Sequence, residues 1–182
     1  MTFEKTVTLK DGRTCLLRNG VASDGQVVLD VFNWTHDETD YLLTYSDENR
    51  FTASQEADFL QRKTDSANNV EIIAVVDDVV AGTAGIDVLG MRDKIKHRAV
   101  FGIAITKEFW GLGIGKYLME ACIECAREAG YLQLELEVVA ENERAVEMYR
   151  RAGFIEYGRN PKAFRLRTGE YQELIDMRLE LK

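Results

Sequence analysis

Hydrophobic residues recur along this chain with two different periods, and each period predicts one kind of element. Over residues 24–34 the apolar positions have the spacing of a helix face, whereas Leu134, Leu136 and Val138 alternate with polar residues as in a half-buried strand. The sequence predicts helices over 24–34, from the capping box that begins at Thr52, over 113–129 and over 142–152. It predicts strands over 14–18, 70–76, 79–88, 96–106, 132–138, 154–167 and 171–181.

The order of these elements is typical of a mixed α+β domain of the α/β class. Two β-branched stretches, 70–76 and 79–88, are separated only by Asp77 and Asp78, so we expect a hairpin there. The chain has 182 residues, of which 46% are hydrophobic and 30% charged. This length suits one sizeable core better than two. We therefore expect a single domain over residues 1–182.

The charge of the chain excludes one class of partner. The net charge is −8, whereas a phosphate backbone is bound by a basic face, so we expect no nucleic-acid partner. The acidic balance fits either plain solubility or a cationic, amine-bearing substrate. The polar first residues do not resemble a signal peptide, and the longest apolar run, 99–105, is far shorter than the roughly 20 residues of a membrane helix. We expect a cytoplasmic protein with no membrane partner.

The three cysteines do not form a disulfide framework. Cys122 and Cys125 make a CxxC pair, but they share helical spacing with Leu118 and Ala126, which predicts buried apolar packing. No second Cys or His pair lies nearby to complete a tetrahedral metal site. We expect neither a redox role nor a bound metal.

The stretch FWGLGIGKYL, residues 109–118, has three alternating glycines between a strand and a helix. The spacing matches neither the P-loop, which would need glycine at Trp110, nor the dinucleotide pattern GxGxxG. A glycine loop that opens a helix still directs several free N–H groups and the positive end of the helix dipole at one spot. This arrangement predicts a phosphate or pyrophosphate site, with Lys116 beside it. Close packing of strand against helix is the alternative explanation of the glycines.

Two longer stretches carry a family resemblance. GIAITKEFWGLGIGKYLMEAC and LELEVVAENERAVEMYRRAGF place Gly113 and Gly115 in a glycine loop, followed by Asn142, Tyr149 and a Gly-Phe pair at 153–154. Together they resemble the acyl-CoA-binding core of the GNAT superfamily of N-acetyltransferases. One position departs from the pattern: Trp110 stands where the family usually has Gln or Arg, which puts a side-chain contact in question and leaves the main-chain site intact.

The resemblance implies a fold and a co-substrate. The fold is a central, mostly antiparallel twisted sheet of about seven strands, flanked by about four helices, with splayed strands at the acyl-CoA site. The acyl-CoA-binding core covers about residues 97–158, and acetyl-CoA lies with its pyrophosphate on the loop and its pantetheine arm along a strand edge. The implied acetyl-CoA-binding residues are Ile103, Ala104, Ile105, Gly111, Leu112, Gly113, Ile114, Gly115, Lys116, Asn142 and Tyr149.

The resemblance also implies acyl transfer to an amine, which needs an acid and a base. Tyr149 lies seven residues after Asn142 on one helix face, so its hydroxyl is placed to protonate the departing thiolate; a tyrosine that only packs is the alternative. Asn142 caps its helix, contacts acetyl-CoA, or does both. Glu137 is our candidate base, and we expect Glu135 to be a paired or exposed surface carboxylate instead. His97 is interpreted as structural.

The predicted function is acetyl transfer from acetyl-CoA to a primary amine of a small molecule or peptide, in a ternary complex. Two alternatives stay open: a non-catalytic acyl-CoA sensor or interaction module, and a general phosphate-ligand binder. Trp34 and His36 either line the acceptor pocket or pack on a helix face. The acceptor's identity and a homodimeric assembly are also left open, because the variable first helices and late loops form the acceptor pocket in the family.

Overall fold

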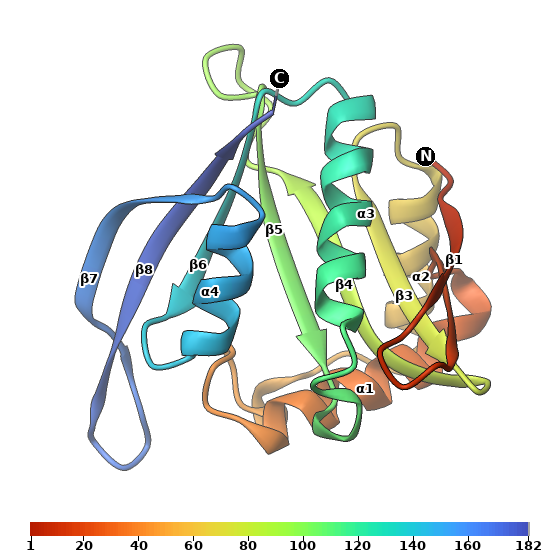
Figure 1. The fold of residues 1–182 in the computed structure, drawn as a ribbon, viewed down its shortest axis with the longest axis horizontal. Helices are drawn as coiled ribbons and strands as arrows, with labels where there is room; N and C mark the ends of the chain where they lie inside the picture. The colour runs from red at the N-terminus through yellow and green to blue at the C-terminus, as the bar shows by residue number, and fades with distance from the viewer. Residues whose placement is uncertain (182) are drawn as a thin grey trace.

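Eight strands form one open sheet in the order β1-β2-β3-β4-β5-β6-β8-β7 (Figure 1). The computed structural model describes residues 1–181. All neighbouring strands are antiparallel except β5 and β6, which are parallel. The strands are β1 (Glu4–Thr8), β2 (Thr14–Asn19), β3 (Val70–Val76), β4 (Val79–Val88), β5 (Arg98–Ile105), β6 (Gln133–Val139), β7 (Ile155–Arg165) and β8 (Tyr171–Glu180).

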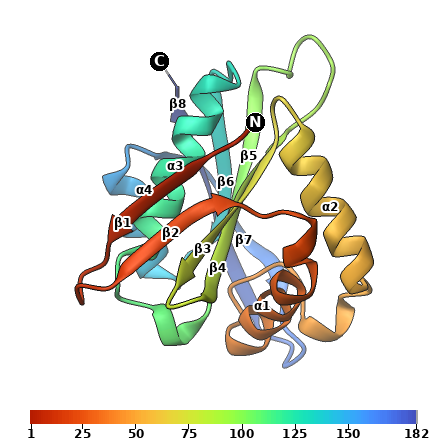
Figure 2. The ribbon, with the colours of Figure 1, turned by 90° about the vertical axis from the view of Figure 1, so that its right-hand side faces the viewer.

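Helices cover both faces of the sheet. They are α1 (Gly25–Glu38), α2 (Ala53–Asp65), α3 (Ile114–Glu128) and α4 (Glu143–Arg151). Figure 2 shows α3 and α4 on one side of the sheet and α1 and α2 on the other. Successive side chains of a strand point to opposite faces, so a strand covered on both sides is apolar throughout. In β3, Ile72 belongs to the larger core under α3 and Ile73 to the smaller core under α1 and α2, and both are fully buried.

The predicted fold class is confirmed, with one strand added. All seven predicted strands and four predicted helices are present, and Asp77 and Asp78 turn the β3–β4 hairpin with positive φ angles of 50° and 63°. The expected count of about seven strands missed β1, a largely exposed edge strand whose sequence EKTVT has one apolar residue. An edge strand with no buried face has no hydrophobic alternation to reveal it. Helix α1 also continues to Glu38, beyond its predicted end.

The two cysteines of the CxxC pair pack in the core, as their helical spacing predicts. Cys122 and Cys125 are unpaired and buried on α3, and burial raises the pKa of the Cys125 thiol to about 12. Such thiols are poor nucleophiles and metal ligands at neutral pH. Among residues 1–181, no helix combines the length and apolar character needed to cross a membrane.

A buried lysine ties α2 to the sheet. The Lys63 side chain is 4% exposed, and its ammonium lies 2.6 Å from the Asp87 carboxylate and 3.3 Å from that of Glu71. It also donates to the carbonyl of Ile86 at 3.3 Å. Glu56, on the same helix, is nearly as buried, and desolvation and then the charge of Glu71 raise its pKa to about 7, an effect that Lys63 partly offsets. Above neutral pH, the ionised Glu56 therefore lowers the stability of the folded protein.

Glu56→Gln should stabilise the protein at pH 8 and have little effect at pH 4.5. The unfolded chain ionises Glu56 near pH 4.5 and the folded protein near 7, so the folding penalty grows between these values and is complete above them. Removing the charge should raise the free energy of unfolding at pH 8 by about 1–3 kcal/mol. Urea unfolding at both pH values measures the difference.

The matched control is Asp58→Asn, which removes a carboxylate from the exposed side of the same helix. It should change stability by less than about 0.5 kcal/mol at either pH. A Glu56→Gln effect of equal size at pH 4.5 and pH 8 would show that burial of this charge is not its cause.

Candidate active site

Strands β5 and β6 are hydrogen-bonded over only part of their length. They pair from Arg98 with Gln133 to Val100 with Glu135, after which both strands continue without pairing to each other. Splayed parallel strands leave backbone N–H and C=O groups without a strand partner along their facing edges. The splayed strands expected from the resemblance are therefore present, and the free edge of β5 over 101–105 can pair with an extended ligand.

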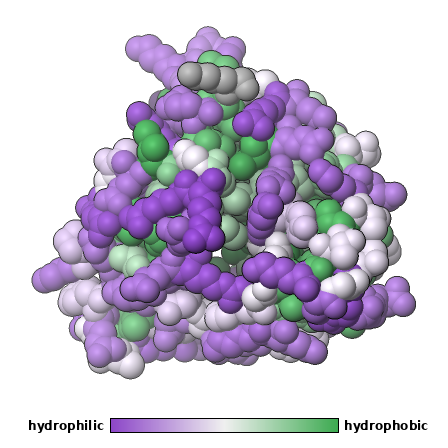
Figure 3. Space-filling model, in the orientation of Figure 1, coloured by the Kyte–Doolittle hydropathy of each residue, from purple (hydrophilic) through white to green (hydrophobic). Residues whose placement is uncertain are grey.

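A cavity of about 890 Å³ lies at this split. Residues of β5, β6, α3 and α4 line it, together with the segment that follows α1 and the last two strands. Figure 3 shows pale and green, apolar surface recessed between purple, hydrophilic side chains on the face that carries α3 and α4. The volume falls in the range of small-molecule and cofactor sites, roughly 300–1,000 Å³.

The glycine loop ends at one rim of this cavity. Gly113 is the N-cap of α3 and has a φ of 96°, the left-handed conformation that favours glycine. Within residues 1–181, the N–H groups of Gly113, Ile114, Gly115 and Lys116 bond no protein acceptor. These free donors and the positive end of the α3 dipole point to the same place, which is the geometry of an anion site.

Gly115 lies between α4 and the end of β5. A Cβ built there would lie 3.1 Å from the sulfur of Met148 on α4 and 3.4 Å from the Cδ1 of Ile105 on β5. A side chain at this position would therefore fill the space between the loop helix and the free edge of β5. The glycine keeps the route from the anion site into the split open.

Trp110, the position that departs from the family pattern, is hydrogen-bonded to the last residue of β5. Its indole N–H donates to the carbonyl of Ile105 at 2.6 Å, and the guanidinium of Arg144 lies 5.4 Å from the ring centroid. Both Trp110 and Arg144 line the cavity. The tryptophan thus satisfies the last carbonyl of β5 and gives α4 a cation–π contact across the loop.

Tyr149 is held in the cavity wall by two aromatic rings. Its ring centroid lies 6.1 Å from that of Phe101 and 5.8 Å from that of Phe154. The side chain is buried, which raises the pKa of the phenol above its ordinary value and keeps it protonated at neutral pH. No hydrogen-bond partner of the hydroxyl occurs among the described residues, so the proton remains available to a ligand in the cavity.

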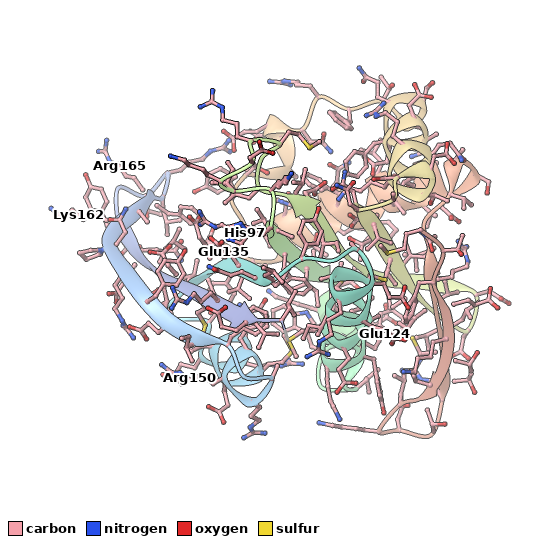
Figure 4. All side chains as sticks on the ribbon, turned by 90° about the horizontal axis from the view of Figure 1, so that it is seen from above. His97, Glu124, Glu135, Arg150, Lys162 and Arg165 are labelled. Carbon is pink, nitrogen blue, oxygen red and sulfur yellow. The ribbon has the colours of Figure 1, made fainter. Side chains whose placement is uncertain are left out.

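The two candidate carboxylates of β6 have different surroundings. Glu135 is buried and bonds the guanidinium of Arg98, with its Oε2 2.6 Å from Nη2, as a paired carboxylate should. Figure 4 views the protein from the paired end of β5 and β6, where Glu135 lies near His97. Glu137, two residues on, lines the cavity. Of the three carboxylates on the cavity wall, Glu120 and Glu147 pair with Lys116 and Arg151, whereas Glu137 has no cation partner among residues 1–181.

Asn142 acts as a helix cap in this structure. Its side-chain oxygen accepts from the N–H of Ala145 at 3.3 Å at the start of α4. Asn142 also lines the cavity, so the capping interaction fixes the position of a polar group on the cavity wall. Both roles expected from the sequence are compatible with this geometry.

The side of the cavity away from the glycine loop is walled by two segments that are far apart in sequence. Residues 41–43, after α1, form one wall, and Phe164 and Leu174 of β7 and β8 contribute to the other. Beyond the cavity, the guanidinium of Arg167 lies 2.6 Å from the carboxylate of Asp47 and 4.0 Å from the ring centroid of Tyr45. We call these three residues the Tyr45–Arg167 latch. In Figure 4 the hairpin that contributes Arg167, marked by Lys162 and Arg165, lies at the outer edge of the molecule.

The structure brings almost all the predicted site residues together. Every predicted acetyl-CoA-binding residue except Leu112 lines the cavity, as do Tyr149 and Glu137. Leu112 instead packs against the main core and accepts a backbone hydrogen bond from Lys10. Trp34 is 54% exposed and His36 stacks on Phe32 with ring centroids 3.8 Å apart; neither lines the cavity, so packing on the helix is the correct alternative for His36.

Sequence reasoning missed the residues that line the cavity from outside the expected acyl-CoA-binding core, about residues 97–158. They are Lys10, Thr35, Thr39, Tyr41, Leu42, Leu43, Phe164 and Leu174. None of them belongs to a recognisable motif. Only their convergence in the fold identifies them, because they come from the first hairpin, the end of α1, the following segment and the last two strands.

Comparison with known proteins agrees with this geometry. The family model described as Acetyltransferase (GNAT) family matches residues 29–154. The L-amino acid N-acetyltransferase AaaT of Escherichia coli is 32% identical over 118 residues, which cover 64% of this chain and 72% of that protein. A GNAT-family acetyltransferase of Streptococcus pneumoniae superposes with a TM-score of 0.87 at 26% identity, covering 91% of this chain and 99% of that one.

The fold also matches a structure solved with the co-substrate. A GNAT superfamily phosphinothricin acetyltransferase from Sinorhizobium meliloti, in complex with acetyl-CoA, superposes with a TM-score of 0.81 at 18% identity, over 96% of this chain and 89% of that one. At this identity the likeness concerns the fold. Because the family model spans most of the sequence, including the glycine loop and Tyr149, the chain belongs to the GNAT family of acetyltransferases, which are acetyl-CoA-dependent acyltransferases.

Proposed function

We propose that this protein transfers the acetyl group of acetyl-CoA to a primary amine of a small molecule or peptide, by direct attack in a ternary complex. One observation carries the proposal: a single cavity joins the free N–H groups of the glycine loop, the free edge of β5 and the unpartnered hydroxyl of Tyr149. These are the groups needed to hold a pyrophosphate, an extended amide-bearing arm and a departing thiolate, in that order along the cavity.

Acetyl-CoA then lies with its pyrophosphate on residues 111–116 and its pantetheine arm beside Ile103, Ala104 and Ile105. Its thioester reaches the split between β5 and β6. The acceptor enters from the side walled by residues 41–43 and Phe164, where Glu137 is the carboxylate without a cation partner among the described residues. An unpaired carboxylate favours an amine over an anionic acceptor.

The reaction follows from these positions. The neutral amine nitrogen attacks the thioester carbonyl carbon, and a backbone N–H near Ile105 stabilises the developing oxyanion. The carbon–sulfur bond then breaks, the thiolate takes the proton of Tyr149, and Glu137 receives the proton of the amine directly or through water. Glu137 then releases its proton to solvent and Tyr149 regains one, so the products are the acetylated amine and CoA thiol.

A thiol-release assay tests the proposal with a panel of acceptors. The panel contains polyamines, amino acids, aminoglycosides and peptides with a free N-terminus, each supplied with acetyl-CoA. We expect CoA thiol to appear above the hydrolytic background with at least one class. The amino-acid arm has specific support, because the Escherichia coli relative is an L-amino acid N-acetyltransferase.

The same experiment separates catalysis from the sensor alternative. A sensor would be stabilised thermally by CoA and would release no thiol with any amine. That result, with a protein shown to bind acetyl-CoA, would argue strongly against the proposed reaction. Competition between CoA and simple nucleotides would identify a general phosphate binder.

A further inference from the structure

The first hairpin of the chain is attached directly to the glycine loop. The N–H of Lys10, in the turn between β1 and β2, donates to the carbonyl of Leu112 at 3.1 Å. On the other side of Gly113, the hydroxyl of Tyr117 donates to the carbonyl of Thr8, also at 3.1 Å. These two bonds fix the turn over the start of α3, and Figure 2 shows β1, the edge strand of the sheet, on the side of α3.

This attachment places the Lys10 side chain over the anion site. The Cγ and Cε atoms of Lys10 each lie 3.8 Å from the position of a Cβ built on Gly113, which is ordinary van der Waals contact. Lys10 also lines the cavity. Lys10 is solvent-exposed, and its ammonium, one bond beyond Cε, lies near Gly113 at the start of α3.

The charge of Lys10 is also free, in contrast to that of the loop's own lysine. Among residues 1–181, no carboxylate lies within ion-pair distance of Lys10, whereas Lys116 is 3.7 Å from Glu120 and lies 5.8 Å from the ring centroid of Tyr117. Lys116 also lines the cavity, but it shares its charge with Glu120. Within the described part of the chain, Lys10 is a cation that the fold brings to the loop without a carboxylate partner.

We propose that Lys10 binds the pyrophosphate of acetyl-CoA, as a cation supplied to the glycine loop by the N-terminal hairpin. The assignment rests on the proposed placement of acetyl-CoA. The loop supplies neutral N–H donors, and an ammonium beside them adds a charge-assisted hydrogen bond, which is stronger than a neutral one. The hairpin of β2 and the unpredicted strand β1 therefore has a role in binding.

Lys10→Ala should weaken CoA binding by about tenfold, the effect of losing one charge-assisted hydrogen bond. Isothermal titration without an acceptor measures the Kd for CoA, for dephospho-CoA and for pantetheine. Dephospho-CoA lacks the 3′-phosphate and retains the pyrophosphate, so its binding should weaken by the same factor. Pantetheine lacks both, so its Kd should not change.

Two variants control for charge and folding. Lys10→Arg keeps the cation and should retain most of the affinity. Lys5→Ala removes the same charge from an exposed site on β1, away from the cavity, and should leave the Kd for CoA unchanged. The melting temperature of each variant shows whether the hairpin remains folded.

Three results would overturn the assignment. An unchanged Kd for CoA in Lys10→Ala would exclude a contact with the co-substrate. A loss confined to CoA, with dephospho-CoA unaffected, would place Lys10 on the 3′-phosphate instead. Failure of the unaltered protein to bind CoA at all would overturn both this assignment and the proposed function, whereas the first two results leave the proposed function standing.

Discussion

Replacing Tyr149 by phenylalanine should lower kcat by about 100-fold or more, the usual contribution of a positioned general acid. The phenylalanine ring keeps the contacts with Phe101 and Phe154, so the Kd for acetyl-CoA should stay within about twofold of that of the unaltered protein. Steady-state kinetics with the best acceptor and titration with acetyl-CoA measure the two quantities separately. Equal kcat values would remove Tyr149 from the mechanism.

Tyr131→Phe is the matched control for this change. Tyr131 is also buried, but its hydroxyl donates to the carbonyl of Asn68 at 3.0 Å, outside the cavity. Loss of the Tyr131 hydroxyl should lower the stability of the protein and leave kcat unchanged. The raised pKa of Tyr149 adds a check on the unaltered enzyme: because the phenol stays protonated, kcat should show no descending limb between pH 7 and about pH 10.

Gly115→Val should weaken acetyl-CoA binding by about 10- to 100-fold, the effect of the 1–3 kcal/mol that overpacking typically costs. The valine side chain would occupy the space between Met148 and Ile105, through which the co-substrate passes in the proposed binding mode. The backbone of Gly115 is helical, so the chain can still fold with valine there. Titration with CoA measures the loss, and circular dichroism checks the fold.

Two further variants test whether space is the cause. Gly115→Ala adds one methyl group, which the flexible Met148 can accommodate, and should weaken binding much less. The double variant Gly115→Val with Met148→Ala should recover part of the affinity by removing the atom nearest the new side chain. A valine variant with unchanged Kd would mean that acetyl-CoA does not pass Gly115.

The predicted site residues that the structure brings to one cavity are local in the chain. A strand, a glycine loop and a helix follow one another between 98 and 128, so their spacing alone places free N–H groups beside the end of β5. Tyr149 lies within one short helix of its cap, Asn142, and the helix period then fixes its direction. The spacing of residues along the chain is enough to predict local arrangements of this kind.

The parts that the sequence does not predict depend on contacts between distant segments. Lys10 reaches a loop about 100 residues away through a backbone hydrogen bond, which any residue type could make. The Tyr45–Arg167 latch joins positions 120 and 122 residues apart, and its exposed ion pair leaves no hydrophobic signature. Neither contact creates a periodic pattern, so no window of the sequence reveals it.

Because β5 and β6 pair incompletely, we expect the stability of the protein to depend on the concentration of acetyl-CoA. Beyond Val100 and Glu135 these two central strands do not pair with each other, and in the proposed binding mode acetyl-CoA lies along the free edge of β5 as a missing strand would. A ligand present at a hundred times its Kd adds about 2.7 kcal/mol to the free energy of unfolding. Proteases cleave transiently opened chains, so the amount of this protein in a cell is expected to rise and fall with acetyl-CoA.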